Sequence, residues 1–158
     1  MTIRPIQEKD NAQIEKVIKD VLISYGANRE GFAFVDPELA DMFQAYSPNS
    51  RAYYVLEENS EILGGAGIAE LNEAGKNYCE LQKMYFHPRA RGRGYGRKIM
   101  DVCLNFAKEI GYSHCYLETI SEMTEAQKLY KSVGFEYIEH RMGQTGHSSC
   151  PVFMLKEL

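Results

Sequence analysis

The middle of the chain contains three stretches typical of β-strands, separated by turns too short to hold a helix. The stretches Ala52–Glu57, Ile62–Leu71 and Tyr78–His87 are rich in Val, Ile, Leu and Tyr, and polar turns join them at 58–61 and 72–76. Connections this short allow only antiparallel neighbours, because a parallel crossover needs a dozen or more residues. The sequence therefore predicts an antiparallel meander, which excludes a regular alternation of strands and helices.

Helical periodicity appears on both sides of this meander. Asp10 can cap a helix whose apolar positions recur every three or four residues, and Asp36-Pro37 is typical of a second helix start. The expected helices are Asp10–Tyr25, Asp36–Tyr46, Gly94–Ile110 and Met123–Val133; further strands are expected around Ile3 and at His114–Thr119, Tyr137–Arg141 and Val152–Leu155. The predicted order, β-α-α-β-β-β-α-β-α-β-β, indicates an α+β or α/β fold with a mixed sheet of about seven strands.

Length and composition indicate one ordinary domain. The 158 residues match a single domain, expected over 1–158, and are enough to bury a core without a disulfide or metal. No apolar run approaches the roughly 20 residues of a membrane span, and the first residues lack a secretory apolar stretch. The four cysteines and four histidines show no paired metal-ligand spacing. We therefore expect a cytoplasmic protein with reduced thiols, no metal and no membrane association.

The charge distribution singles out one segment. The net charge is −4, which does not favour nucleic-acid binding, yet residues 87–98 (HPRARGRGYGRK) carry five Lys or Arg and no acid. Without these five the remainder carries −9. A basic segment in an acidic chain predicts a local anion site.

The centre of that segment, Arg91-Gly92-Arg93-Gly94-Tyr95-Gly96, lies between a predicted strand and a predicted helix. A helix start offers unpaired N–H groups, and glycines let the backbone approach a phosphate closely. A Walker loop is excluded because no Ser or Thr follows a Gly-Lys pair, and the GxGxG spacing departs from the GxGxxG dinucleotide fingerprint. The alternative to an anion site is a solvent-exposed basic turn.

Two motifs together resemble those of the GCN5-related N-acetyltransferases (GNAT family). Residues 91–96 match the signature [QR]-x-x-G-x-[GA], and Ala126, Leu129-Tyr130 and Gly134-Phe135 match A-x-x-L-Y-x-x-x-G-F. The resemblance implies a mixed, mostly antiparallel seven-stranded sheet flanked by about four helices and splayed between the fourth and fifth strands. It also implies that acetyl-CoA is the co-substrate.

The same resemblance assigns a set of cofactor-binding residues. Backbone N–H groups of residues 91–96 would bind the pyrophosphate, the edge of the fourth strand would pair with the pantetheine arm, and an N–H near Met84 would face the thioester oxygen. The implied residues are Met84, Tyr85, Phe86, Arg91, Gly92, Arg93, Gly94, Tyr95, Gly96, Arg97, Met123 and Ala126. Met123 stands where many members carry an Asn that bonds the pantetheine, so we expect Thr119, Ser121 or backbone to replace that contact.

Glu80 and Tyr130 are the expected catalytic pair. An alkyl ammonium must lose a proton before it attacks a thioester, and Glu80 matches the catalytic glutamate of the histone-acetylating branch of the family. Strand alternation puts Glu80 and Met84 on one face unless a bulge intervenes, and Glu70, Glu118 or water are the substitute bases. Tyr130 matches the family tyrosine that reprotonates the CoA sulfur, although its spacing also suits core packing.

The sequence leaves the acceptor open. The resemblance places it against residues 24–43 and 141–151, which mix charges and aromatic side chains, so an amino acid, a polyamine, an aminoglycoside and a protein N-terminus all remain candidates. The acidic balance outside the basic loop favours a cation. A small-molecule or peptide amine is expected as partner, without nucleic acid or membrane, and a homodimer is compatible with the sequence. The alternative function is a catalytically silent CoA-binding sensor or regulatory module.

Overall fold

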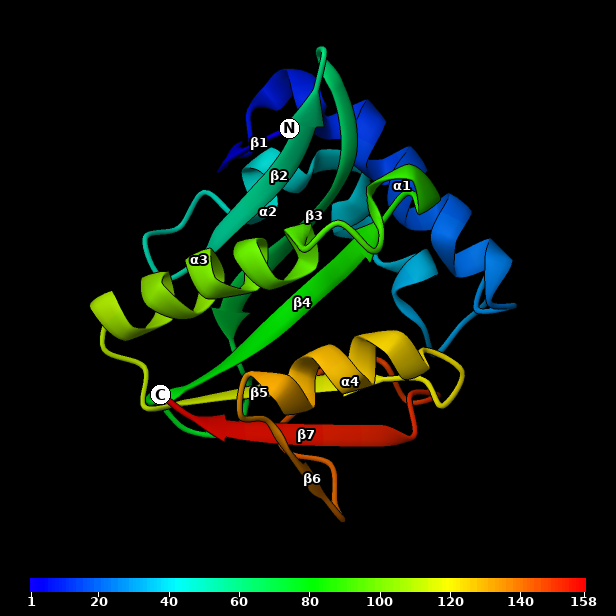
Figure 1. Cartoon of the computed structure of the whole chain (residues 1–158). Coiled ribbons are helices and arrows are strands. Elements are labelled where there is room, and N and C mark those ends of the chain that lie inside the picture. The colour runs from blue at the N-terminus through cyan, green and yellow to red at the C-terminus, as the bar shows by residue number, and fades with distance from the viewer.

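A computed structural model describes all residues, 1–158, and contains one seven-stranded sheet in the order β1-β2-β3-β4-β5-β7-β6 (Figure 1). The strands are β1 (Thr2–Pro5), β2 (Ala52–Glu58), β3 (Glu61–Glu70), β4 (Tyr78–Phe86), β5 (His114–Thr119), β6 (Glu136–Ile138) and β7 (Val152–Glu157). The helices are α1 (Asn11–Ser24), α2 (Met42–Ala45), α3 (Tyr95–Glu109) and α4 (Thr124–Ser132), with 3₁₀ turns at Glu8–Asp10, Ala33–Val35, Pro37–Asp41 and Pro88–Ala90. This confirms the mixed seven-stranded sheet with about four helices.

β2, β3 and β4 pair antiparallel in chain order, as the meander predicts, and β1 pairs antiparallel with β2. Short turns connect β2 to β3 and β3 to β4, so each strand folds back on the one before it. Two glycines of β3 have a packing reason. A Cβ on Gly65 or Gly67 would lie 2.5 Å from the ring of Tyr53, so only glycine leaves room for that buried tyrosine.

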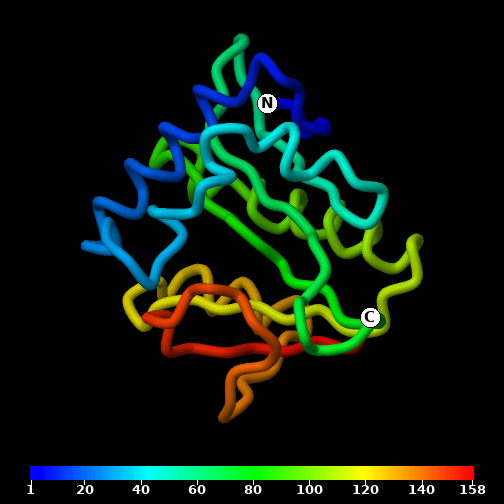
Figure 2. Tube along the Cα trace, turned by 180° about the vertical axis from the view of Figure 1, so that it is seen from behind, coloured from blue at the N-terminus to red at the C-terminus, as the bar shows by residue number.

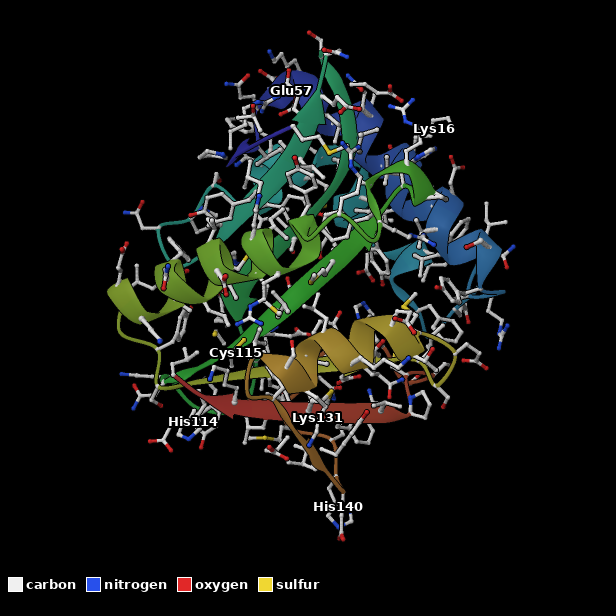
Figure 3. The ribbon with its side chains drawn as sticks, viewed as in Figure 1. Lys16, Glu57, His114, Cys115, Lys131 and His140 are labelled. Carbon is white, nitrogen blue, oxygen red and sulfur yellow. The ribbon has the colours of Figure 1, made fainter.

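β4 and β5 are the only parallel neighbours, and they separate soon after they meet. Their register covers three pairs, from Tyr78–His114 to Glu80–Tyr116, although β4 continues for six more residues. Figure 1 shows β4 and β5 diverging from their meeting point near the C-terminus, and Figure 3 labels His114 and Cys115 at this closed end. The predicted splay between the fourth and fifth strands is confirmed.

The helices cover both faces of the sheet. α3 and α4 lie on the face of the sheet that is in front in Figure 1. α1 and α2 lie on the opposite face, which is toward the viewer in Figure 2. Two buried clusters correspond to these faces, one built on Ile14, Ile18 and Leu22 of α1 and one on Ile99 and Cys103 of α3. None of the helices is long and apolar enough to span a membrane.

The start of α1 differs from the prediction. Asp10 does not cap the helix with its side chain; its buried carboxylate accepts hydrogen bonds from Arg4 at 2.7 and 2.9 Å and from the N–H of Gln7 at 2.8 Å. Asp10 thus forms an ion pair with Arg4 of β1 instead of a local helix cap. This ion pair fixes the start of α1 against the sheet. The predicted helix Asp36–Tyr46 is divided between a 3₁₀ turn and the single turn of α2.

The segment between β6 and β7 returns to the N-terminal part of the chain. The N–H of Ser149 donates to the carbonyl of Gly31 at 3.1 Å, and His147 Nε2 lies 2.9 Å from Asp36 Oδ2. Figure 2 shows these red-orange and light-blue segments side by side. The two segments together close one side of the space between β4 and β5.

Candidate functional site

A β-bulge reverses the facing of side chains halfway along β4. Gly65 pairs with Tyr85 and Gly67 with Gln82, so β4 has one residue more than β3 in this interval. Lys83 takes up the extra length with a φ of 49°, and its carbonyl accepts a 2.7 Å hydrogen bond from the buried Tyr53 hydroxyl. A non-glycine residue with a positive φ is uncommon, and the hydrogen bond from Tyr53 stabilises this backbone conformation at Lys83.

The bulge makes the simple alternation prediction wrong. Glu80 and Gln82 lie on the α1 side of the sheet, but Met84 packs against the α3 cluster and Tyr85 against the α1 cluster. Glu80 and Met84 therefore face opposite sides. Because the strands are splayed here, both side chains still border the opening between β4 and β5.

The loop after β4 presents a row of unused backbone donors. Gly92 and Gly94 have φ of 70° and 80°, and Gly94 is the N-cap of α3. The N–H groups of residues 92–97 donate to no acceptor in the protein, whereas the N–H of Arg91 donates to the carbonyl of Pro88. Six consecutive free N–H groups at a helix start are suited to bind an anion. The N–H of Arg91, which the resemblance adds to the pyrophosphate donors, is thus already engaged within the protein.

A cavity of about 450 Å³ lies beside this loop, between β4 and α4. Most of the predicted cofactor residues line it: Met84, Tyr85, Phe86, Arg91, Gly92, Gly94, Gly96, Arg97, Met123 and Ala126. Gly96 forms part of the wall, since a Cβ there would lie 3.0 Å from Leu129 Cδ2 and 3.5 Å from Met84 Cε. The structure thus brings together two motifs about thirty residues apart in sequence.

Arg93 and Tyr95 are the predicted cofactor residues whose side chains do not line the cavity. The Tyr95 ring packs against Leu56 and Leu63, and the half-exposed Arg93 guanidinium lies near that ring and 3.9 Å from Glu58. Their backbone N–H groups remain in the free row. Any role for these two residues in the anion site therefore falls to the backbone.

The cavity also has walls that sequence reasoning missed. Val21, Tyr25, Ala90, Glu125 and Leu129 complete the lining. Leu129 belongs to the A-x-x-L-Y motif, which marks it directly as a neighbour of the site. Val21 and Tyr25 lie on the apolar stripe of α1, and no feature of that stripe distinguishes core positions from cavity positions.

Met123 lies at the start of α4 and borders both this cavity and the next one. The Thr119 hydroxyl lies 3.7 Å from the Met123 sulfur. Thr119 is buried and makes no other side-chain hydrogen bond to the protein, so its hydroxyl is the polar group nearest to the substituted position. Of the predicted replacements for the absent Asn, Thr119 is the one that lies against Met123.

Tyr130 reaches the same place from α4. Its ring is buried against Phe135, and its hydroxyl makes no hydrogen bond to another protein group. Burial raises its pKa well above the ordinary tyrosine value, so the phenol stays protonated near neutral pH. Tyr130 is therefore a buried, protonated phenol that lines both adjoining cavities.

Two smaller cavities adjoin this point. One of about 40 Å³ shares Met84, Tyr85, Met123 and Tyr130 with the large cavity, and Glu80 also lines it. The next, about 110 Å³, is lined by Glu80 and Gln82 together with polar residues: Glu38, Tyr46, Arg51, Glu70, Asn72, Gln144 and Thr145. Glu80 therefore lies between the space beside Tyr130 and a polar space on the far side.

The environment of Glu80 brings the pKa of its carboxyl group close to neutral pH. Glu80 is only 4% exposed, and this burial raises its pKa to about 7. The Gln82 amide donates to Glu80 Oε2 at 2.7 Å and partly opposes that rise, and the Tyr46 hydroxyl donates to Gln82 Oε1 at 2.7 Å. A carboxyl with a pKa near neutrality is suited to take and release protons.

The two substitute bases are engaged elsewhere. Arg51 donates to both oxygens of Glu70, at 2.6 to 3.1 Å, and lowers its pKa. The buried Glu118 accepts hydrogen bonds from Tyr116 and Thr145, and Arg141 lies 3.1 Å from its second oxygen. Glu80 is the acidic residue of these cavities that has no cationic partner within 4 Å.

A buried ion network closes the small cavity. Lys83 pairs with Glu38 and lies 3.1 Å from Asp36, which in turn contacts His147. Burial alone would lower the pKa of Lys83, but the carboxylates of Asp36 and Glu38 outweigh burial and raise it. Asp36 likewise raises the pKa of His147 against the effect of burial. This network joins residues that are 111 positions apart, from Asp36 to His147.

The sequence matches the family description "Acetyltransferase (GNAT) family" over residues 19–135. Among curated proteins, YjgM of Escherichia coli K12, an uncharacterized N-acetyltransferase, is 42% identical over 99% of this chain and 94% of its own. An uncharacterized N-acetyltransferase of Schizosaccharomyces pombe is 27% identical over 83% of this chain and 79% of its own.

Solved structures share the fold. A GNAT acetyltransferase from Staphylococcus aureus Mu50 superimposes with a TM-score of 0.86 at 19% identity, covering 99% of this chain and 98% of that one. The yncA protein of Salmonella typhimurium, solved with acetyl-CoA, has a TM-score of 0.77 at 23% identity, covering 99% and 93%. At sequence identities of 19% and 23%, these similarities establish the fold alone.

Proposed function

Because the chain belongs to the acetyltransferase (GNAT) family, we propose that it transfers an acetyl group from acetyl-CoA to a primary amine by direct attack in a ternary complex. Residues 1–158 would work as one domain. The four cysteines are free and buried, as in proteins of a reducing compartment, which supports a cytoplasmic enzyme.

The row of free N–H groups at 92–97 suits the pyrophosphate of acetyl-CoA. Anionic oxygens would satisfy these donors and gain from the α3 dipole, and the nearby Arg97 would add positive charge. Beyond Glu80 no strand pairs with β4 on its β5 side, so the pantetheine amides could pair with this edge as an added strand. The thioester would then lie beside Met84, with an N–H near Met84 facing its oxygen.

Glu80 is the proposed general base. A primary ammonium entering from the polar cavity would give its proton to the Glu80 carboxylate, directly or through one water. The neutral nitrogen then attacks the acetyl carbonyl, forming the C–N bond. The pKa near 7 supports this role because it leaves a substantial fraction of Glu80 ionised at neutral pH.

Tyr130 is the proposed general acid. As the C–S bond breaks, its hydroxyl would donate a proton to the departing sulfur, and the resulting phenolate would take the second proton that the acetylated nitrogen loses. The lack of a protein hydrogen-bond partner favours this role, because the hydroxyl is available to the cavities that Tyr130 lines. The products are the acetylated amine and free CoA.

One observation carries the proposal. A large cavity with six free backbone donors beside it adjoins, at Tyr130, a small cavity that is lined by a buried carboxyl with a pKa near neutrality. Neither an anion site alone nor a buried carboxyl alone would indicate acyl transfer.

The test combines binding with turnover. Calorimetry should show that acetyl-CoA binds the wild-type chain and not Gly94→Val, because valine strains the left-handed backbone that aims the N–H groups. Gly111→Val is the matched control: Gly111 has a φ of 98°, open space around it and a place at the other end of α3. Release of CoA thiol with a panel of amines then measures catalysis. Unchanged affinity in Gly94→Val would remove the cofactor site, and binding without turnover would favour a CoA-binding regulatory module.

A further inference from the structure

We propose that the acceptor is a primary amine with no carboxylate on the neighbouring carbon, the class represented by decarboxylated amino acids. This inference rests on the proposed function, and it removes free amino acids from the acceptors that the sequence left open. In the two cavities around Glu80, every charged side chain other than Glu80 is paired within the protein.

The 110 Å³ polar cavity contains one cation, and that cation is fully occupied. Arg51 donates from Nε and Nη2 to Glu70 and from Nη1 to the carbonyl of Ala45. Glu38, the third acidic residue of this cavity besides Glu70 and Glu80, is paired with Lys83. No guanidinium or ammonium in this cavity is free to receive a substrate carboxylate.

The 40 Å³ cavity repeats this pattern. Its cationic side chains are Lys83 and His147, and Asp36 lies within 3.1 Å of both. Its acidic residue Glu118 lies against Arg141, whose guanidinium also donates to the carbonyls of His147 and Cys150. Each cation near the reaction point is again bound to the protein itself.

Glu80 is the exception in both cavities. It has no cation within 4 Å, and its Oε1 accepts no hydrogen bond from the protein. A buried carboxylate is costly unless it is paired, so the site has room for one positive charge brought by the substrate. An ammonium fills this need, while a carboxylate one carbon away from it would meet like charges and no counter-ion.

Matched pairs of acceptors test this inference. Histidine and histamine, and tyrosine and tyramine, differ within each pair only by the α-carboxylate. With saturating acetyl-CoA, we expect the kcat/KM for each decarboxylated amine to exceed the kcat/KM for the corresponding amino acid by about tenfold or more. Equal or higher kcat/KM for the amino acids would overturn the inference and leave acetyl transfer intact. An absence of turnover with every pair, while acetyl-CoA binds, would remove the proposed function and the inference with it.

A variant tests the cause. Glu70→Gln removes the carboxylate that occupies Arg51 and frees the guanidinium inside the polar cavity. The amine-to-amino-acid ratio of kcat/KM should fall by about tenfold, because a substrate carboxylate gains a partner. Glu61→Gln is the control, since Glu61 is also paired with an arginine, Arg89, but on the exposed surface. An unchanged ratio in Glu70→Gln, or an equal fall in Glu61→Gln, would contradict the assignment to Arg51.

Discussion

The side-chain amide of Gln82 donates a 2.7 Å hydrogen bond to Oε2 of Glu80 and leaves Oε1 of the same carboxylate open to the cavities. The Tyr46 hydroxyl holds the Gln82 amide in this orientation. The geometry fixes which oxygen can receive a proton from an amine. It also stabilises the ionised form of a carboxyl that burial would otherwise keep neutral.

Replacing Gln82 should therefore move the pH dependence of the reaction. Gln82→Leu removes a donor to the charged form, so the pKa of Glu80 rises further above 7 and the rise of kcat/KM with pH shifts upward by about one unit. Tyr46→Phe should shift it in the same direction by less. A pH–rate profile of each variant measures this, with the exposed Gln44→Leu as control. A profile identical to wild type in Gln82→Leu would contradict the role assigned to the amide.

Tyr130→Phe should reduce turnover and leave the fold unchanged. The hydroxyl makes no hydrogen bond to the protein, so its removal leaves no partner unsatisfied, but the departing sulfur loses its proton donor. We expect kcat to fall about 10- to 10³-fold with little change in the Kd for CoA. Tyr112→Phe, which loses a 3.0 Å bond to the carbonyl of Ser50 away from the cavities, is the control. Full activity in Tyr130→Phe would leave the residue a packing role only.

Substitutions in the loop should separate backbone from side-chain effects. Gly96→Val should abolish acetyl-CoA binding, because the valine side chain would fill the cavity beside Leu129. Gly96 does not have a left-handed φ, so the substitution acts through space in the cavity and not through backbone strain. Arg93→Ala should only weaken binding, since its guanidinium lies outside the cavity. Calorimetric Kd values measure both, and a larger loss in Arg93→Ala than in Gly96→Val would contradict the backbone account.

Glu80 should also make the folded chain less stable as pH rises. Its pKa is about 7 in the folded chain and near 4.5 when unfolded, so the folded state holds the proton more tightly. Stability is then greatest below the unfolded pKa and decreases as pH rises through 7, by about 3 kcal/mol for this one group. Glu80→Gln should raise the Tm relative to wild type at pH 8 and change it little at pH 4.5. An equal Tm difference at both values would show that the buried carboxyl is not the cause.

The order of the helices and strands could be predicted from the sequence, because it depends on local patterns. The two motifs could likewise be recognised locally. Period-two and helical spacing locate the meander and the main helices, and the Arg/Gly segment marks the turn before α3. The same motifs led directly to Gly94 and Tyr130, which line the large cavity.

Long-range contacts explain the parts that the sequence did not predict. The bulge at Lys83 depends on the Tyr53 hydroxyl, thirty residues away, and it turns Met84 to the face opposite Glu80. The contact between Asp36 and His147 spans 111 positions, so the closure of the small cavity is not visible in any local pattern. Asp10 is typical of a helix cap by its position, but Arg4 engages it.

The pH dependence of Glu80→Gln tests the central claim most directly. For the wild type, kcat/KM for a primary amine should rise with pH through the pKa of Glu80, about 7 before ligands bind. Glutamine keeps the shape and removes the base, so the loss should be largest near neutral pH and should shrink as pH approaches the amine's own pKa, where free amine needs no base. If Glu80→Gln instead raises KM equally at every pH and leaves kcat unchanged, Glu80 only attracts the cation and the general-base assignment is wrong.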